Sequence, residues 1–194
     1  MLEYELVPYR AAVEEYARKR VDYLFHNRGA EHALIILSNL FENANKCIRI
    51  AAQKLCDNSV VNTQTYVESM KHFLDRENTT LNMLIVDVPS LEEVNSCDRS
   101  NCFYWMLYNH PAYKEGRIQL RQGNGRAFKD SKSGNFINFC TGDDRMFRLE
   151  NNVEARTAIA NFNDCAYTNE LITAFDAVYP DQEPVDLHYY FQNA

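Results

Sequence analysis

The sequence lacks several features that would assign it at once to a class of protein. No run of residues approaches the roughly 18 consecutive apolar residues of a transmembrane helix, so we expect no membrane span and no membrane partner. The N-terminal segment carries Glu3 and Glu5 and no apolar core, which predicts that no signal peptide is present. There is no internal repeat and no long low-complexity tract. These absences favour a globular protein of the cytoplasm.

Basic charge is also scarce. The chain has 20 Lys and Arg against 27 Asp and Glu, for a net charge of −7. Affinity for a nucleic-acid backbone depends on clustered Lys and Arg, so this balance does not favour nucleic acid as a partner. One segment, 114–132, is locally basic through Lys114, Arg117, Arg121, Arg126, Lys129 and Lys132. Nucleic-acid binding without chemistry therefore stays open as a hypothesis, beside the simpler interpretation of a solvated loop and strand edge.

The six cysteines form no clear metal or disulfide framework. Cys47, Cys140 and Cys165 lie in or beside apolar runs, where cysteine acts as a small core residue. Cys97 and Cys102 are the closest pair, and this spacing without a second pair is a weak zinc signal. We therefore predict no metal, no cofactor and a reducing compartment, the cytoplasm.

The 194 residues, 46% of them hydrophobic, are enough for one domain with appendages. The pattern divides the chain into an N-terminal helix over 1–29, an α/β domain over 30–179 and a short C-terminal aromatic tail over 180–194. Helical periodicity predicts that the first helix runs over 8–27 and that a second, largely buried helix runs over 30–45.

Residues 47–88 have the pattern of strand, helix and strand. A β-leaning start at 47 is followed by a helix to about 76, which Asn62 or Thr63 can cap, and by an apolar strand over 80–88. A crossover of this length permits parallel pairing. Asp87 ends the second strand, at the edge where ligands collect in open α/β sheets, although a cap for the next turn is the simpler role.

The middle of the chain is less regular. Residues 89–99 have the composition of a loop, and 100–109 form an aromatic helix with the single tryptophan, Trp105. A third strand over 117–121 alternates basic and apolar residues, and 122–134 is a polar, glycine-containing loop.

The most informative part is the segment 134–178. Two alternating strands are joined by Gly142, Asp143 and Asp144, and a third strand and a helix to Tyr179 follow. The chain therefore predicts helix, strand, helix, strand, helix, four strands and a final helix.

This order resembles one half of a phospholipase D-superfamily enzyme, and it covers residues 30–179. The closest local match is 135–164, followed by a helix that contains Ala174, Phe175 and Asp176. The resemblance implies a mixed β-sheet sandwiched by helices. Active members of that family carry His-x-Lys, four further residues and Asp, and often a later Gly-Ser-x-Asn. Their His attacks a phosphodiester, their Lys holds the phosphate, and two such motifs meet across a dimer or pseudo-dimer.

The reactive pair of that motif is missing from this chain. The resemblance places Phe136 at the His and Asn138 at the Lys, while Asp143 matches the Asp and Asn163 the final Asn. Phe136 supplies neither an activatable atom nor a base, and His-x-Lys occurs nowhere in the chain. The resemblance thus implies the fold without phosphohistidine chemistry.

Several polar residues remain near that position in the sequence: Asp143, Asp144, Arg145, Arg148, Glu150, Asn161 and Asn163. Strand alternation puts Arg148 and Glu150 on one face. Buried charges need partners, so these two are expected to pair with each other or with Asp143 and Asn161. A salt-bridged sheet surface and a remodelled polar pocket both fit. Cys140 is a weak nucleophile candidate because no His lies near it in sequence.

The leading hypothesis is a non-catalytic binding or assembly module that forms a homodimer or joins a protein partner in a larger complex. Its expected interface is the aromatic tail with Leu187, Tyr189, Tyr190 and Phe191. The alternative is a nuclease or phosphodiesterase with a non-standard site. Phosphate would then be held by Arg117, Arg121, Arg145 and Arg148 with Asn161 and Asn163, while Asp143 and Glu150 would bind metal or act as base.

Overall fold

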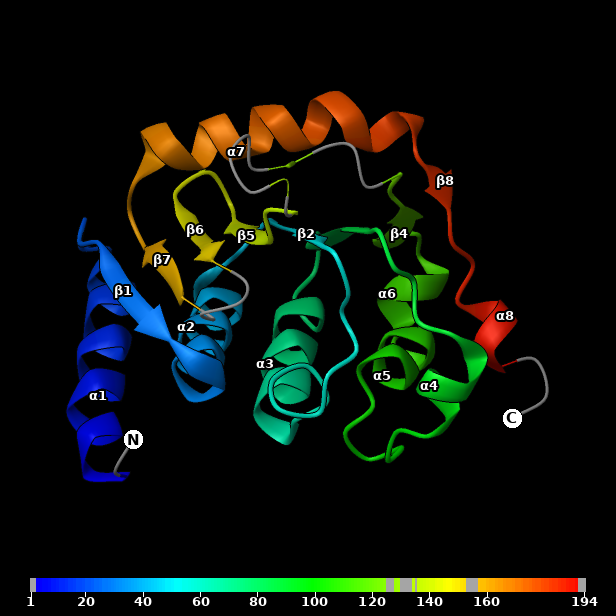
Figure 1. Cartoon of the computed structure of the whole chain (residues 1–194), viewed down its shortest axis with the longest axis horizontal. Helices are drawn as coiled ribbons and strands as arrows, with labels where there is room; N and C mark the ends of the chain where they lie inside the picture. The colour runs from blue at the N-terminus through cyan, green and yellow to red at the C-terminus, as the bar shows by residue number, and fades with distance from the viewer. Residues whose placement is uncertain (1–2, 125–127, 130–133, 135, 153–156, 192–194) are drawn as a thin grey trace.

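The computed structural model of the chain is one mixed sheet with helices on both of its faces (Figure 1). It describes residues 3–124, 128–129, 134, 136–152 and 157–191. Two basic residues of the 114–132 segment, Arg126 and Lys132, lie outside the described residues.

The described sheet has eight strands in the order β1-β7-β6-β5-β2-β3-β4-β8. They are β1 (Phe25–Arg28), β2 (Cys47–Ala52), β3 (Thr80–Ile85), β4 (Ile118–Gln122), β5 (Phe139–Gly142), β6 (Met146–Asn152), β7 (Thr157–Asn161) and β8 (Glu183–Pro184). β2, β3 and β4 are parallel, and all the other neighbours pair antiparallel. Parallel neighbours need crossovers, which here are helical.

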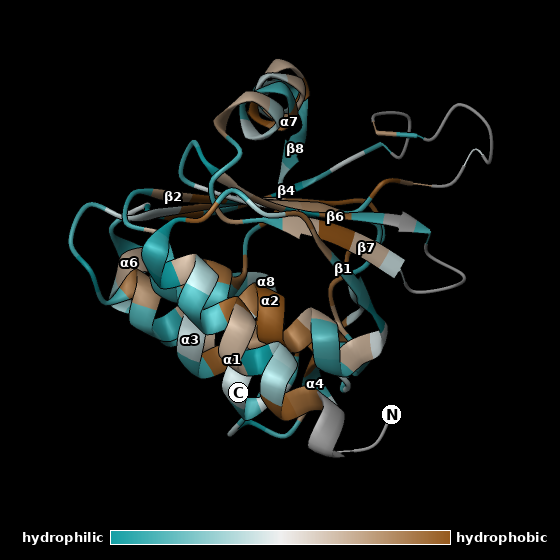
Figure 2. Ribbon diagram, turned by 90° about the vertical axis from the view of Figure 1, so that its left-hand side faces the viewer, coloured by the Kyte–Doolittle hydropathy of each residue, from teal (hydrophilic) through white to brown (hydrophobic). Residues whose placement is uncertain are grey.

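The helices form two unequal layers, as Figure 2 shows. One face is covered by α1 (Glu3–Lys19), α2 (Gly29–Asn43), α3 (Gln64–Leu74), α4 (Leu91–Asn95), α5 (Phe103–Asn109), α6 (Pro111–Lys114) and α8 (His188–Phe191). The long helix α7 (Cys165–Val178) crosses the other face, and the short 3-10 helix η1 (Tyr179–Asp181) follows it. No helix among the described residues is long and apolar enough to cross a membrane.

Each layer has its own core. Between the sheet and the larger helical layer, Phe41, Tyr66 and Phe103 are almost fully buried and meet edge to face. Under α7, a smaller cluster forms around Phe139 and Phe175. Burial of each such aromatic side chain contributes roughly 1.5–3 kcal/mol, so both layers are held mainly by apolar packing.

The predicted strand-helix-strand unit is confirmed. β2 and β3 pair in parallel from Cys47 opposite Thr80 to Ala52 opposite Ile85. The Thr63 side chain accepts a hydrogen bond from the Tyr66 amide and so caps α3. The predicted hairpin is also present, because β5 and β6 are antiparallel neighbours and β7 follows β6.

Two local predictions are wrong. The first helix ends at Lys19 rather than near residue 27, because Arg20 adopts a left-handed conformation with φ of 54°. The chain then turns back and forms edge strand β1 against β7. Within the predicted loop 89–99, Ser90 and Glu93 form a reciprocal capping box that starts α4.

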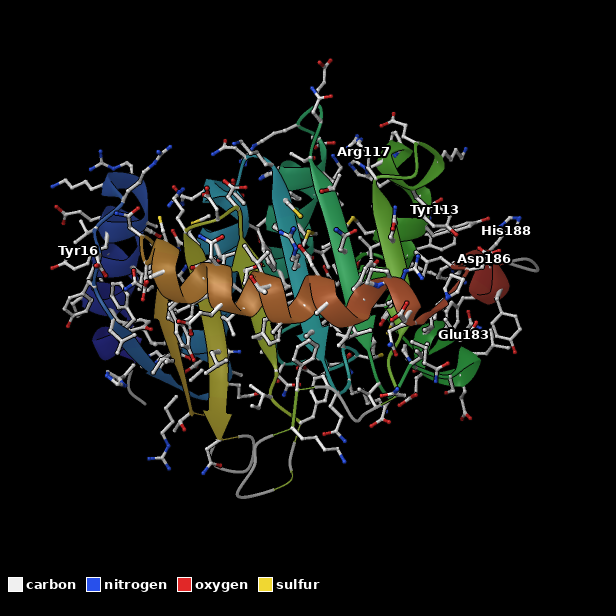
Figure 3. All side chains as sticks on the ribbon, turned by 90° about the horizontal axis from the view of Figure 1, so that it is seen from above. Tyr16, Tyr113, Arg117, Glu183, Asp186 and His188 are labelled. Atoms are coloured by element: carbon white, nitrogen blue, oxygen red, sulfur yellow. The ribbon has the colours of Figure 1, made fainter. Side chains whose placement is uncertain are left out.

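The aromatic tail packs on its own domain. Leu187, Tyr190 and Phe191 are buried, and Phe191 meets the Trp105 ring edge to face at 5.1 Å. Figure 3 shows Tyr113 near Asp186 and His188, and the Tyr113 hydroxyl donates to Asp186 at 2.7 Å. Of the four residues expected to form an interface, three are therefore internal, and Tyr189 alone is well exposed, at 62%.

Candidate functional site

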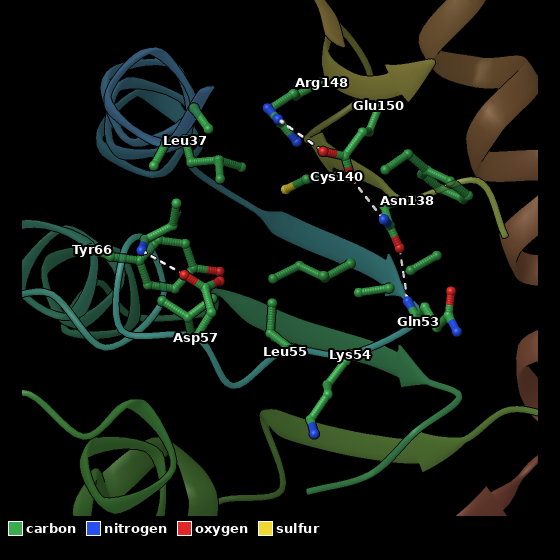
Figure 4. Close-up of a pocket in the computed structure, with 18 of the residues that line it drawn as sticks. Leu37, Gln53, Lys54, Leu55, Asp57, Tyr66, Asn138, Cys140, Arg148 and Glu150 are labelled. Atoms are coloured by element: carbon green, nitrogen blue, oxygen red, sulfur yellow. Dashed lines mark hydrogen bonds and ion pairs between the residues drawn. The ribbon is translucent and has the colours of Figure 1, made fainter. Parts of the chain in front are cut away.

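A pocket of about 440 Å³ lies between the start of α2 and the carboxyl end of β2 (Figure 4). One wall is the sheet, a second is α2 with Tyr66 of α3, and a third is the segment that follows β2. Side chains that carry polar groups into its lining are Gln53, Lys54, Asp57, Ser59, Tyr66, Asp87, Asn138, Cys140, Arg148 and Glu150. The volume is in the range of small-molecule sites.

The sheet wall carries three of these groups in one connected row. Arg148 and Glu150 alternate on β6 and therefore share a face, as the strand pattern predicts. The Asn138 amide donates to Glu150 Oε2 at 2.7 Å and accepts from the Gln53 backbone N–H at 2.7 Å. Arg148 Nη2 lies 3.9 Å from Glu150 Oε1, which is an ion pair without a hydrogen bond.

Arg148 is the exceptional residue of this wall. It is 9% exposed, and its Nε has no hydrogen-bond partner among the described residues. Burial lowers the pKa of the guanidinium, an effect that the Glu150 carboxylate opposes, but arginine stays protonated in proteins. Burying the Nε donor without an acceptor is costly, since this group has given up water without a replacement. The Nη groups of Arg148 are the donors that an acceptor in the pocket can reach, and the nearest carboxylate oxygen lies 3.9 Å from Nη2.

Other unsatisfied polar groups lie on the same side of the sheet. Among the residues that the structure describes, the Tyr9 hydroxyl has no hydrogen-bond partner. It is close enough to Arg148 for the cation to influence its pKa, although burial dominates and raises that pKa to about 12. Both side-chain amide atoms of Asn27 likewise have no partner within the described part of the chain, and Asn27 pairs with Ala158, which pairs with Glu150. Buried groups of this kind are normally satisfied by water or a ligand.

The start of α2 adds positive potential. Gly29 and Ala30 line the pocket, and the N-cap residue Arg28 supplies no side-chain capping bond. The first N–H groups of a helix have no partner within the helix, and the macrodipole makes this end favourable for an anion. The helix end and Arg148 therefore favour the same kind of ligand group.

Three further charged residues line the pocket, and each already has a hydrogen-bond or ion-pair partner within the protein. Asp57 Oδ1 accepts from the Ser59 and Val60 amides and shapes the turn after β2. Lys54 forms an ion pair with Glu93. Asp87, the predicted strand-end carboxylate, does reach the pocket, where it accepts from Gln53 Nε2 at 3.2 Å.

The described pocket lining contains no pair suited to nucleophilic catalysis. No histidine lines it, and burial raises the pKa of the Cys140 thiol well above its usual range, which keeps Cys140 protonated. Phe136, at the position of the family's nucleophile, is buried in the cluster under α7. Among the described residues, no group of three or more His, Cys, Asp or Glu could hold a metal ion.

Asp143 lies outside the pocket. It occupies the tight turn between β5 and β6 with φ of 55°, and its carboxylate accepts from the backbone N–H groups of Asn45, Lys46 and Cys47. Glu150 lies toward the other end of the same hairpin. The expected pairing of Asp143 with Arg148 or Glu150 is absent from the described residues, and the two carboxylates do not converge on one metal or one base position.

Replacing Asp143 should test this structural role. We expect Asp143→Ala to lower the free energy of unfolding by about 3 kcal/mol or more, because three backbone donors lose a charged acceptor and alanine is disfavoured at positive φ. Asp143→Asn keeps an acceptor and tolerates the conformation, so its loss should be clearly smaller. Urea denaturation measures both. Wild-type stability in Asp143→Ala would contradict the assignment.

The other arginines and asparagines of the predicted binding set are held by the protein itself. Arg117 donates to the Leu74 and Thr79 carbonyls, and Arg121 to those of Pro180 and Gln182. These contacts anchor the edge of the sheet and the tail rather than the pocket.

The remaining three residues of that set form a second internal network. Arg145 donates to the carbonyls of Phe162 and Asn43. The Asn161 amide donates to Asp22 and accepts from the Asn163 backbone N–H. Of the residues predicted to hold phosphate, bind metal or act as base, only Arg148 and Glu150 line the pocket among the described residues.

Comparison with solved structures defines the fold class. The chain has a phospholipase D-like fold: it matches Nuc from Salmonella typhimurium, a phospholipase D family member, with TM-score 0.55 and 10% identity over 85% of this chain and 99% of that one. NucT from Helicobacter pylori matches with TM-score 0.51 and 11% identity over 84% of this chain and 100% of that one.

A third similar structure is TrmBL2, an archaeal chromatin protein that binds DNA. The TM-score is 0.60 at 16% identity, over 94% of this chain. This chain spans 65% of the length of TrmBL2. No protein-family model and no curated protein sequence matches the chain. Identities this low establish the shared fold and nothing finer.

Proposed function

We propose that this protein is a non-catalytic binding module that holds a small ligand by an anionic group in the pocket beside α2. The observation that carries the proposal is Arg148, a buried cation in the pocket wall without a hydrogen-bond acceptor among the described residues. Bidentate recognition of a carboxylate or phosphate is what a guanidinium does best.

The surroundings of Arg148 support binding rather than chemistry. The pocket pairs a cation and a helix start with an apolar wall, while the described lining offers no nucleophile with an oriented base. The phosphate-holding set of the alternative hypothesis is dispersed, with Arg117, Arg121 and Arg145 donating to backbone carbonyls. Similar folds occur in a phospholipase D family member and in a DNA-binding chromatin protein, so the fold itself favours neither function.

We also propose assembly with a second copy or another protein, but through a smaller surface than the sequence predicts. The tail that first suggested it is largely internal, and Tyr189 is its one well-exposed aromatic side chain among the described residues. Sedimentation of the wild type and Tyr189→Ala would measure any self-association through this position. Equal behaviour of the two proteins would exclude Tyr189 as a contact.

Binding can be measured by thermal denaturation in sodium acetate, isobutyrate or phosphate at matched ionic strength. At a hundred times the dissociation constant, a ligand adds about 2.7 kcal/mol, or roughly 5–10 °C in Tm for a protein of this size. We expect such a rise with at least one of these anions in the wild type and none in Arg148→Met. Equal responses of the two proteins would overturn the proposal.

The absence of catalysis needs a separate assay. The wild type should not hydrolyse bis(4-nitrophenyl) phosphate or single-stranded DNA, with or without added Mg²⁺, Mn²⁺ or Zn²⁺. Hydrolysis that is lost in Glu150→Ala, with the fold intact by circular dichroism, would favour the phosphodiesterase alternative over a binding module.

A further inference from the structure

Two groups of opposite charge lie next to each other in the pocket wall, and each has unused hydrogen-bonding capacity. Arg148 makes no hydrogen bond to a described residue, and Glu150 Oε1 accepts none. Their nearest atoms are 3.9 Å apart, too far for a direct hydrogen bond. The conformations of both side chains are restricted, because Arg148 is buried and Glu150 Oε2 accepts a hydrogen bond from Asn138 at 2.7 Å.

This arrangement complements a ligand that carries both charges on neighbouring atoms. We infer that the ligand is an α-amino acid with an apolar side chain, an inference that rests on the proposed binding function. Its carboxylate binds the guanidinium of Arg148, and its ammonium group donates to Oε1 of Glu150. In an α-amino acid the two charged groups are attached to one carbon, so they match side chains that stand two residues apart on one strand face.

The charge of the pocket argues against a polyanion. Its lining holds the cations Arg148 and Lys54 and the carboxylates Asp57, Asp87 and Glu150. Lys54 is already paired with Glu93, which leaves Arg148 as the lining cation without a hydrogen bond within the described structure. A dianionic group would meet these carboxylates, whereas a zwitterion adds no net charge.

The remaining walls fit an uncharged, apolar side chain. Leu37 of α2, Leu55 and Val61 of the segment after β2, and Ile50 of the sheet line the same pocket as Arg148 and Glu150. An apolar side chain that leaves water for such a wall gains about 25 cal/mol for each Å² buried. The charged row would then fix the orientation, and the apolar wall would add affinity.

Calorimetric titration of the full chain tests the inference with matched probes. L-leucine and L-phenylalanine are compared with 4-methylpentanoate, which lacks the ammonium group of leucine, and 3-methylbutylamine, which lacks the carboxylate. We expect at least one amino acid to bind about tenfold or more tightly than either analogue. Arg148→Met should abolish binding of both the amino acid and 4-methylpentanoate. Glu150→Gln should remove the preference for the amino acid over 4-methylpentanoate.

The outcomes separate the inference from the proposed function. If 4-methylpentanoate binds as tightly as leucine and both need Arg148, the amino-acid inference is wrong and the anion-binding function stands. If the preference survives in Glu150→Gln, the placement of the ammonium group is wrong. If neither amino acid, nor 4-methylpentanoate, nor any anion of the thermal series binds in an Arg148-dependent way, the proposed function fails as well.

Discussion

Truncation of the chain after Asp186 should remove most of its stability. The deleted segment includes Leu187, Tyr190 and Phe191, all of which are buried against the helical layer. Truncation of single buried Leu or aromatic side chains to alanine typically costs about 2–5 kcal/mol, and a whole domain is stable by only about 5–15 kcal/mol. We therefore expect the shortened chain to be unfolded or only marginally folded at 37 °C, as measured by circular dichroism and urea denaturation.

Point variants give this prediction a matched control. Tyr189 is exposed next to the buried Tyr190, so Tyr189→Ala should change the free energy of unfolding by less than about 0.5 kcal/mol. Phe191→Ala removes the ring that meets Trp105 and should cost about 3–5 kcal/mol. A truncated protein with the melting temperature of the wild type would contradict the stabilising role of the tail.

The second large effect concerns the free protein without ligand. Arg148→Met should raise its free energy of unfolding by about 1–3 kcal/mol, because it removes a buried cation that has no acceptor and keeps an apolar stem of similar length. Glu150 loses a loose ion-pair partner at 3.9 Å but keeps its hydrogen bond from Asn138. A gain in stability together with a loss of binding is the expected signature of a functional residue.

Arg145 is the matched control for this variant. It is also buried, but its guanidinium donates to the carbonyls of Phe162 and Asn43. Arg145→Met should therefore destabilise the protein by about 2–3 kcal/mol, the opposite sign, since it strands two acceptors. Thermal and urea denaturation of the two variants in one buffer measures the contrast. Equal destabilisation of both would show that Arg148 has structural partners after all.

Local patterns in the sequence were sufficient for much of the fold. Periodicity placed β2, α3 and β3, the Thr63 cap is a short-range contact, and the alternation of β6 put Arg148 and Glu150 on one face. The end of α1 was missed because Arg20 takes the left-handed conformation without the glycine that usually signals it. The capping box of α4 pairs Ser90 with Glu93 in a segment whose composition is otherwise that of a loop.

The site was harder to predict because its partners are remote in sequence. Asp143 contacts backbone groups 96 to 98 residues away, and Arg121 reaches carbonyls about 60 residues away. Residue type alone could not distinguish these structural roles from phosphate binding. Asn138 was identified only as a substitute for a missing lysine, whereas in the fold it links the Gln53 amide to Glu150 and so helps to build the pocket.

The proposed function requires that the guanidinium of Arg148 gains an acceptor only when a ligand binds. Two-dimensional ¹H–¹⁵N spectra of the arginine Nε–H groups test this directly, with the Arg148 signal identified by its loss in Arg148→Met. On titration with 4-methylpentanoate, we predict that the Arg148 signal shifts, while the signal of Arg145, which already donates to Phe162 and Asn43, stays in place. An Arg148 signal that the titration leaves unmoved would contradict the assignment of Arg148 as the anion-binding residue.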